Sequence, residues 1–591
     1  MKKSILGFHW QQQEFDERYA ETIRQRFQLS ESLSKIIAAK NIPLDEIEEF
    51  LDPKIKTSLP DPFELSGMER AVTHAIDAVL SGKKITIFAD YDVDGATSAA
   101  LLKRFFAAIG VDVGIYVPDR ILEGYGPNSQ ALLNLKKTGT NLVITVDCGT
   151  VSFKPLEDAA KVGLEIIVID HHLGVVEKPE AIAIINPNLL LETFPHKNLC
   201  AAGVTFLFIV AINKRLRERE FYKNKSEPNL LSFLDLVALG TVCDVMPLTG
   251  LNRTFVTQGL KILRQRKNLG LREICDLAGL NEQPSSYHLG FIIGPRINAG
   301  GRVGKSDLGA TILSSEDESR VKEIASQLEN FNKQRKDIEV QVLDEAVKAL
   351  ESGIEEFKKT DPVIFAVSKN WHQGVIGIVA SRLKDLYNRP TVIIAIDDEG
   401  KKGKASCRSI SGIDFGAEIL NARLDGLLLD GGGHAMAGGF SVLTEKISEL
   451  HEFFCKKLGE KVTEISTQNE KKYTAILDVS QVNIELLKEL TKLEPFGVGN
   501  PKPKFLLRDL YKVKASLVGQ KQDHVSCIFS SHNLVGSGNS LQAIAFGSMA
   551  NGLGEMLLSP NFFKNINLIC TLNINSWMGV EKVQMVIEDI L

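Results

Sequence analysis

The sequence predicts an α/β protein of several domains: a doubly wound parallel-sheet domain, a second α/β domain joined to it by a long helix, and a C-terminal β-barrel of OB type. With 591 residues the chain is too long for one hydrophobic core. Short β-branched runs alternate with helical stretches from Lys84 to about Ile312, as in a doubly wound domain. No glycine or proline interrupts residues 316–352, whose near-heptad apolar spacing predicts one long helix.

We expect five parts along the chain: an irregular, partly helical N-terminal extension (1–70), the first α/β domain (71–315), the connector helix (316–352), the second α/β domain (353–463) and the barrel (464–591). In the extension, residues 44–51 predict a short amphipathic helix. The second α/β domain contains strand-like runs at 363–367 and 392–396 and ends in a glycine cluster. Short alternating apolar segments between polar turns predict the barrel.

Composition is that of a soluble globular protein, with 44% hydrophobic and 24% charged residues. We find no apolar stretch that could span a bilayer and no signal peptide. The eight cysteines are scattered without a Cys-x-x-Cys pair, which argues against a structural zinc site or a disulfide framework and favours the cytoplasm. The net charge of −5 does not exclude nucleic-acid binding, because a metal site consumes carboxylates and binding depends on local stripes of charge.

Acidic and histidine residues close four apolar runs of the first α/β domain. These are Asp90, Asp92 and Asp94 after the run ending at Ala89, Asp147 after 142–146, Asp170-His171-His172 after 166–169, and Asp244 after 236–242. We expect each run to be a buried parallel strand, and the carboxyl ends of such strands carry the site. Carboxylates and imidazole converging there would repel one another unless cations held them. The sequence therefore predicts a metal site, with two ions.

The alternation of Asp92 and Asp94 predicts that both carboxylates point to the same side of a strand end. Oxygen ligands suit Mg²⁺ or Mn²⁺, and an added imidazole favours Mn²⁺. Two such ions about 3.5–4 Å apart can clamp the attacking and leaving oxygens of phosphoryl transfer. Thr97 and Ser98 should open the next helix, whose amides favour anions. A single Asp at a strand end is more often a cap or turn residue, but four such ends argue against that reading for the set.

The motifs Asp90–Gly95, Val146–Gly149, Asp170–His172 and Gly240–Val245 occur in the order found in the DHH phosphoesterase superfamily, which the chain resembles from about residue 70 to its C-terminus. The resemblance implies metal ligands at Asp92, Asp94, Asp147, His171 and Asp244, with Asp90 as a further ligand or a group that orients one. It also implies catalytic roles for Asp147, His171 and His172, the last contacting the scissile phosphate or the second ion.

Several downstream segments combine glycine with cationic or amide groups, and we expect them to bind a nucleic-acid strand through its phosphates. Their candidate residues are Arg120, Arg296, Asn298, Arg302, His372, Arg382, Ser406, Arg408, Ser409 and His434. Glycine lets the backbone approach a phosphate closely, and Arg binds it bidentately. Any one arginine, taken alone, is more often an ordinary surface residue. Bases could stack on Trp371 or Tyr125, a contact of about 1–3 kcal/mol per base, but either ring can equally be buried core.

The segment from Trp371 to Phe440 resembles the DHH-associated domain, and residues 493–503 and 575–577 resemble the OB domain of the superfamily's bacterial single-strand-specific exonucleases. This likeness implies a 5′→3′ exonuclease that uses Mn²⁺ or Mg²⁺ to release mononucleotides from single-stranded DNA in repair and recombination. It implies a monomer whose partners are single-stranded DNA, a single-stranded-DNA-binding protein and a helicase, with no membrane.

Two alternatives remain open at this point. The first is a phosphoesterase of the same superfamily that acts on short oligonucleotides or cyclic dinucleotides. The predicted barrel counts against it, because such proteins typically resemble only the first two domains. The second is a scaffold that binds without catalysis. It predicts eroded ligands, whereas every matched ligand is present here.

Overall fold

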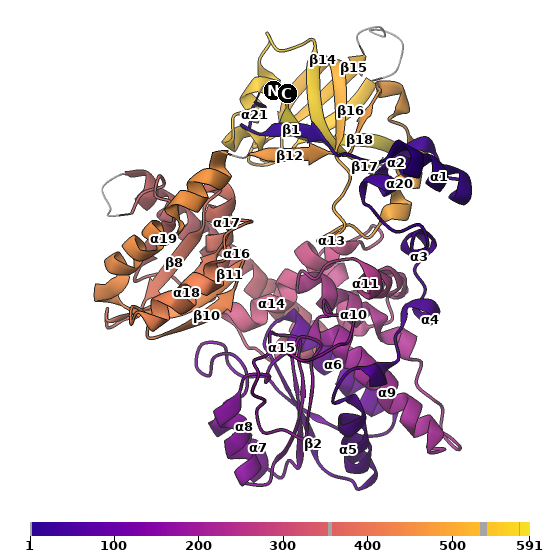
Figure 1. The fold of residues 1–591 in the computed structure, drawn as a ribbon, viewed down its shortest axis with the longest axis vertical. Helices are drawn as coiled ribbons and strands as arrows, with labels where there is room; N and C mark the ends of the chain where they lie inside the picture. The colour runs from indigo at the N-terminus through magenta and orange to yellow at the C-terminus, as the bar shows by residue number, and fades with distance from the viewer. Residues whose placement is uncertain (1–2, 353–356, 468, 532–539, 578–579) are drawn as a thin grey trace. The chain divides into compact units, whose positions relative to one another are not determined.

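The computed structural model describes residues 3–352, 357–467, 469–531, 540–577 and 580–591 (Figure 1). The chain divides into two compact units. The barrel unit joins Met1–Lys54 to Gln468–Leu591, and the main unit spans Ile55–Thr467. No helix in these described ranges has the length and apolar character needed to cross a membrane.

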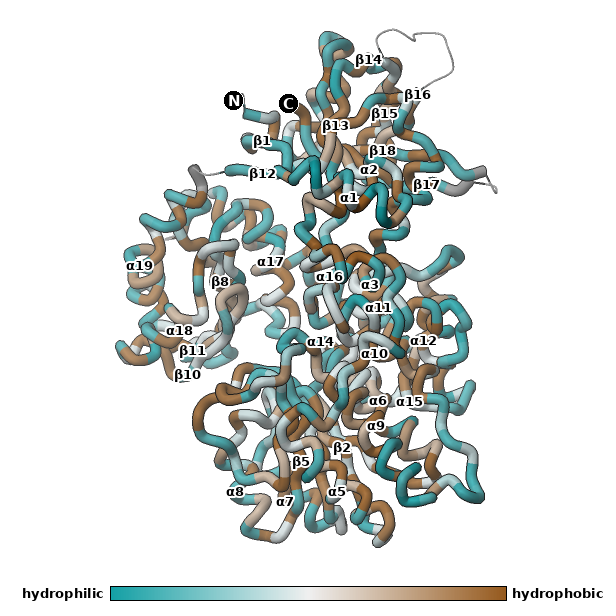
Figure 2. The backbone as a smooth tube through the Cα atoms, turned by 45° about the vertical axis from the view of Figure 1, so that its right-hand side comes forward, coloured by the Kyte–Doolittle hydropathy of each residue, from teal (hydrophilic) through white to brown (hydrophobic). Residues whose placement is uncertain are grey.

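The first sheet of the main unit has five parallel strands in the order β3-β2-β4-β5-β6. The strands are β2 (Ile85–Ala89), β3 (Gly114–Tyr116), β4 (Leu142–Val146), β5 (Glu165–Ile169) and β6 (Ala183–Ile185). Ile87 and Ile144 join the core that includes helices α5 (Met68–Leu80), α6 (Val93–Ala108) and α9 (Ala201–Glu218). Phe88 and Val143 face α7 (Ser129–Lys137) and α8 (Phe153–Lys161) on the other side. The doubly wound prediction is confirmed, and Figure 2 shows how hydrophobic these strands are.

The strand–helix alternation ends earlier than the sequence predicted. After β6 the first domain is helical, and the apolar run before Asp244 is helix α10 (Leu234–Cys243) rather than a strand. Its residues from Leu234 to Thr241 are all buried. A helix buried on every side shows no amphipathic stripe, so periodicity alone cannot separate it from a buried strand. The helices that follow are α11 (Gly250–Leu263), α12 (Leu269–Leu277), α13 (Ser286–His288), the π-helical turn η3 (Leu289–Ile293), α14 (Gly294–Val303) and α15 (Leu308–Ser314).

The connector helix is present as α16 (Glu318–Ser352). Its first part, including Val321 and Leu328, packs into the core of the first sheet. Its last part, including Val342 and Leu350, packs against α17 (Ile376–Tyr387) in a separate core. One helix is therefore shared by two hydrophobic cores.

The second α/β segment has a mixed sheet in the order β10-β11-β9-β8-β7. Its elements are β7 (Ile364–Ser368), β8 (Thr391–Ile396), β9 (Lys402–Arg408), β10 (Asp430–His434), β11 (Ala437–Leu443), α18 (Phe415–Leu424) and α19 (Ile447–Thr467). The predicted glycine cluster forms the β10–β11 hairpin. Gly433 has φ +155, and a Cβ there would lie 2.4 Å from the Ala437 carbonyl oxygen, so the close strand approach requires glycine.

The barrel unit contains a closed barrel of five strands. These are β14 (Phe505–Val518), β15 (His524–Ser531), β16 (Ser540–Ala545), β18 (Val580–Ile590) and β17 (Ile566–Trp577), and β17 pairs back with β14. The predicted barrel is therefore confirmed. The N-terminal segment packs onto it: β1 (His9–Gln12) pairs in parallel with β12 (Glu470–Tyr473), and α1 (Glu17–Phe27) and α2 (Glu31–Ala39) contribute to its core. No local sequence pattern indicated that pairing.

The N-terminal and C-terminal segments lie close together in this unit (Figure 1), and the buried carboxylate of Asp589 joins them. It accepts hydrogen bonds from Ser4 Oγ at 2.6 Å, Trp10 Nε1 at 2.8 Å and the Leu6 amide at 3.2 Å. We expect Asp589→Ala to lower the free energy of unfolding of this unit by about 2–4 kcal/mol, because buried donors are left unpaired. Urea unfolding followed by tryptophan fluorescence measures this. Asp523→Ala, which removes a half-exposed carboxylate, should change it by less than about 1 kcal/mol, and equal losses in both variants would contradict the prediction.

Candidate metal centre

The acidic motifs converge at the carboxyl edge of the first sheet. Asp90 directly follows β2, and Asp147 directly follows β4. Asp170, His171 and His172 are the three residues after the end of β5. Asp244 instead comes from the C-cap of α10, so a helix end and not a fourth strand supplies it. The parallel sheet and one buried helix together bring the four motifs to one place.

Asp92 and Asp94 do not alternate along a strand, because α6 begins at Val93. Asp92 is the N-cap, and its Oδ1 accepts from the amides of Asp94 at 2.8 Å and Gly95 at 3.1 Å. Asp94 lies in the first turn. A Cβ on Gly95 would lie 2.3 Å from the Asp90 carbonyl oxygen, so only glycine fits there. Thr97 and Ser98 were expected to open this helix; they are buried farther along it, and the prediction was wrong.

The imidazole of His171 lies at the centre of the carboxylates. Its Nε2 is 3.3 Å from Asp147 Oδ1, 3.5 Å from Asp244 Oδ2 and 3.8 Å from Asp94 Oδ2. Side-chain donor atoms within 4.8 Å of one another form three sets: Asp94, His171 and Asp244; Asp90, Asp92 and Asp147; and Asp147, His171 and His172. Asp147 and His171 each belong to two of these sets, and Asp147 connects the set of Asp90 and Asp92 to the sets around His171.

Several buried polar atoms of this cluster have no hydrogen-bond partner in the described part of the chain. They are Asp90 Oδ1, Asp147 Oδ1, His171 Nε2 and Asp244 Oδ2. A buried acceptor without a partner normally costs free energy, and a carboxylate costs more than a neutral group. When the carboxylates are ionised and the neutral His171 carries its proton on Nδ1, all four atoms are acceptors, so divalent cations fit them, and no hydrogen-bond donor of the described residues reaches them. The residues present therefore suit the two predicted ions.

The pKa values in this cluster reflect burial and like charge. Burial, with Asp92 nearby, raises the pKa of Asp90 and of Asp147 well above the ordinary value. Burial also raises the pKa of Asp94 to about 7 and of Asp244 to about 9. Burial lowers the pKa of His171 to about 4, which keeps its imidazole neutral as a metal ligand must be.

His172 is oriented by groups that sequence reasoning did not assign. Its Nδ1 lies 2.7 Å from Asp170 Oδ1, and this hydrogen bond raises the pKa of His172 although burial opposes it. The Tyr125 hydroxyl donates to the Asp147 carbonyl oxygen at 2.9 Å and lies 3.1 Å from His172 Nδ1. Asp147 has φ 63, a left-handed conformation that this contact helps to hold. The Tyr125 ring is half exposed, whereas Trp371 is buried and donates to Glu345.

Arg120, Arg302 and Arg408 share one region beside the acidic cluster. Burial and then the charges of Arg120 and Arg408 lower the pKa of Arg302 to about 9. Burial lowers the pKa of Arg408, and Arg120 adds to that effect. Arg120 lies over the Tyr91 ring, 4.9 Å from its centroid. Within the described residues none of the three guanidinium groups has a carboxylate within 4 Å, so an anion would relieve their mutual repulsion.

The other predicted strand-binding residues have different surroundings. Arg296 pairs with Glu329 at 2.6 Å and Arg382 with Glu339 at 3.3 Å, so both face carboxylates of α16. The Ser409 hydroxyl is buried and donates to the Ile413 carbonyl oxygen. The remaining four are at least partly exposed. Asn298 on α14 is half-buried, Ser406 Oγ accepts from Arg408, and His372 Nδ1 accepts from the Gly374 amide. His434 on β10 is exposed, and partial burial together with the charges of Arg408 and His172 lowers its pKa.

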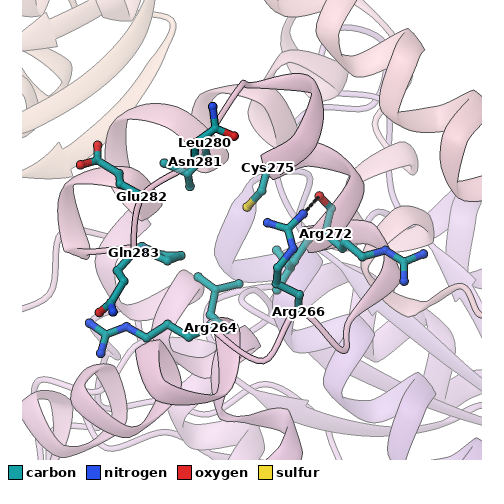
Figure 3. A pocket seen from close by; sticks show the side chains of 11 residues that line it. Arg264, Arg266, Arg272, Cys275, Leu280, Asn281, Glu282 and Gln283 are labelled. Atoms are coloured by element: carbon teal, nitrogen blue, oxygen red, sulfur yellow. Dashed lines mark hydrogen bonds between the residues drawn. The ribbon is translucent and has the colours of Figure 1, made fainter. Parts of the chain in front are cut away.

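A separate cavity of about 290 Å³ lies at the helices α11 and α12 and shares no residue with the acidic cluster (Figure 3). Its lining combines Arg264, Arg266 and Arg272 with apolar side chains and with the polar run Asn281, Glu282 and Gln283. Arg266 pairs with Asp276 and also donates to the Arg272 carbonyl oxygen, and Arg272 pairs with Glu318. Two of the three arginines are thus neutralised by this chain, and the cavity has no set of metal ligands among the described residues.

Comparison with known proteins matches three family descriptions to the three folded regions. The DHH family N-terminal domain matches residues 84–241, the DHHA1 domain residues 360–460 and the RecJ OB domain residues 473–589. The single-stranded-DNA-specific exonuclease RecJ of Haemophilus influenzae is 34% identical over 544 residues, which cover 91% of this chain and 92% of that protein. RecJ of Escherichia coli is 34% identical over 552 residues, with the same coverage.

Solved structures of RecJ proteins also match this chain. RecJ of Thermus thermophilus in complex with Mn²⁺ matches with a TM-score of 0.78 and 25% identity, covering 99% of this chain and 79% of that one. An exonuclease RecJ bound to manganese matches with a TM-score of 0.56 and 31% identity, over 68% of this chain and 96% of that one. With the ligand cluster, the sheet order and the barrel all in place, the chain belongs to the RecJ family of DHH proteins.

Proposed function

We propose that this protein is a single-stranded-DNA-specific exonuclease that hydrolyses phosphodiester bonds with two divalent ions, Mn²⁺ or Mg²⁺. The observation that carries the proposal is the set of four buried acceptor atoms without partners in the described chain, on Asp90, Asp147, His171 and Asp244. The named relatives are single-strand-specific exonucleases, and structural neighbours are complexes with Mn²⁺ and Mg²⁺.

In this proposal Asp94, His171 and Asp244 would hold one ion, Asp90 and Asp92 would hold the other, and Asp147, which lies near both groups of ligands, would contribute to the binding of both. Such a pair of ions supplies a deprotonated water and neutralises charge on the attacking and leaving oxygens. The neutral imidazole of His171 remains available as a ligand because its pKa is about 4. Asp170 and Tyr125 fix the orientation of His172, whose raised pKa favours a positive charge beside the phosphate.

The end of the strand is held by Arg120, Arg302 and Arg408. Their mutual repulsion makes this region favourable for a 5′ phosphate, and the family resemblance supplies the 5′→3′ direction. We assign catalysis to residues 71–315, strand binding to 353–463 with the connector 316–352 between them, and capture of longer single strands to the barrel at 464–591. We further propose that the protein acts in the cytoplasm as a monomer, in DNA repair and recombination, with a helicase and a single-stranded-DNA-binding protein as partners; the family resemblance supports this proposal.

Replacing Asp147 tests the metal chemistry, because it lies near both groups of proposed ligands. Asp147→Asn preserves size and tolerates the left-handed backbone, and we expect it to lower the rate of nucleotide release more than about 100-fold because the ions would lose a shared carboxylate ligand. Release of mononucleotides from end-labelled single-stranded DNA in Mn²⁺ measures the rate. Asp112→Asn, at an exposed carboxylate, is the matched control. An undiminished rate in Asp147→Asn would reject the assignment.

Replacing one cation tests recognition of the strand end. We expect Arg408→Ala to slow degradation of 5′-phosphorylated strands by about tenfold to 100-fold more than of 5′-hydroxyl strands, since a charge-assisted hydrogen bond is lost. The comparison uses the same oligonucleotide with either end. Arg423→Ala, an exposed arginine on α18, should leave both rates unchanged. Equal slowing on both ends would show that Arg408 does not contact the end phosphate.

The raised carboxylate pKa values predict how pH affects stability. Asp94 and Asp244 have pKa values of about 7 and about 9 in the folded chain against an ordinary 3.8, so folding takes up protons between these values. Without ions, the contribution of these two groups to the free energy of unfolding should be complete below about pH 4 and should be lost as the pH rises toward 9. Thermal unfolding in EDTA should therefore occur several degrees lower at pH 8.5 than at pH 6, and Mn²⁺ should raise the midpoint more at pH 8.5. Asp244→Asn should raise the midpoint in EDTA and reduce the Mn²⁺ effect; a Mn²⁺ effect independent of pH would contradict the prediction.

A further inference from the structure

The middle of the connector helix α16 is polar and buried, unlike its two ends. Asn332 is 1% exposed, Arg335 8% and Glu339 7%. Apolar residues before and after them pack into two different cores. Burying charged groups is costly unless they are paired and hydrogen-bonded, so a plain connector would gain more from apolar residues here. These side chains lie at the seam between the two cores.

The buried polar residues form one network that reaches the second α/β segment. Arg335 donates to Asn332 Oδ1 at 2.7 Å and to Glu339 Oε2. The other oxygen of Glu339 accepts from Arg382 Nε of α17 at 3.3 Å. One carboxylate therefore joins the connector helix to the first helix of the neighbouring fold. We call Asn332, Arg335, Glu339 and Arg382 the connector network.

Helix α17 carries this link to the proposed strand-end site. A Cβ on Gly377, five residues before Arg382 in the same helix, would lie 2.9 Å from Ser406 Oγ and 3.2 Å from Arg408 Nη2. The start of α17 thus lies directly against Arg408, which we place at the 5′ phosphate, and against the neighbouring Ser406 hydroxyl. A second contact joins the first α/β domain to the segment just before α17: Arg302 Nη1 donates to the Gly374 carbonyl oxygen at 3.0 Å. A Cβ on Gly374 would in turn lie 2.2 Å from the Arg302 carbonyl oxygen.

We propose that the connector network positions Ser406 and Arg408 relative to the metal centre and thereby sets which phosphodiester bond is cut. The inference rests on the proposed exonuclease function. Apolar surfaces tolerate small sliding movements, whereas a carboxylate between two guanidinium groups is satisfied in one register only. Arg382 and Glu339 are then positioning residues: they touch neither ion nor strand and act through Gly377 and Arg408.

The test compares Glu339→Gln and Arg382→Gln with the wild-type full chain in Mn²⁺. We expect both to degrade 5′-phosphorylated single strands about 10-fold to 100-fold more slowly, because misplacement by about 1 Å has effects of this size. We also expect dinucleotides to appear among the products and the preference for a 5′ phosphate to fall. The shift of the unfolding midpoint by Mn²⁺ should stay as in the wild type. The double variant should lose no more than either single one if the two residues act as a unit.

Arg382→Lys retains a donor for Glu339 and should keep mononucleotides as the product. Asp344→Asn removes an exposed ion pair with Lys348 on the same helix and is the matched control. Because the Arg382 side chain is 63% exposed, Arg382→Gln tests the network even where Glu339→Gln fails to fold. Folded variants with wild-type product length and end preference overturn the inference, as does equal slowing on both strand ends. An inactive wild-type chain would instead overturn the proposed function, and this inference with it.

Discussion

Mutual repulsion among buried carboxylates is the constraint on which the rest of the structure depends. Asp90, Asp94 and Asp147 are each at most 3% exposed, and Asp94 and Asp147 both approach the His171 imidazole. The chain offsets part of their charge with backbone amides: Asp94 accepts from Ala201 and Ala202 at the start of α9, at 2.6 and 2.9 Å. Amides cannot neutralise the whole cluster, because other oxygens of Asp90, Asp147 and Asp244 remain without donors among the described side chains and amides. The fold thus maintains an arrangement that cations complete.

Such a cluster persists only where a rigid scaffold holds it. The strands that carry it are buried from end to end, and Gly95 lets the start of α6 pass against the Asp90 backbone. Asp147 keeps a left-handed backbone while Tyr125 holds its carbonyl oxygen. Strain and unsatisfied groups at one site are maintained by packing elsewhere.

The sequence predicted the strands and their terminal acids because both signals are local. It did not predict that Asp92 caps a helix or that Asp244 follows one, because α10 is buried on all sides and lacks a helical stripe. It also treated Arg296 and Arg382 like Arg302 and Arg408. What separates them is the presence of Glu329 and Glu339 on α16, 33 and 43 residues away. The pairing of β1 with β12 joins residues about 460 positions apart and leaves no local pattern.

The arginines without carboxylate partners and the carboxylates without donors are two halves of one arrangement. Arg120, Arg302 and Arg408 repel one another, and so do the acids beside them. The two groups interact electrostatically: Asp92 opposes the lowering of the Arg302 pKa, and Arg120 opposes the raising of the Asp90 pKa. Within the described part of the chain, none of these three guanidinium groups nevertheless forms a salt bridge with the acids. A phosphodiester with two divalent ions supplies both missing partners at once: cations for the carboxylates and an anion for the guanidinium groups. Neither half could be neutralised by the chain itself without filling the space in which the strand must lie.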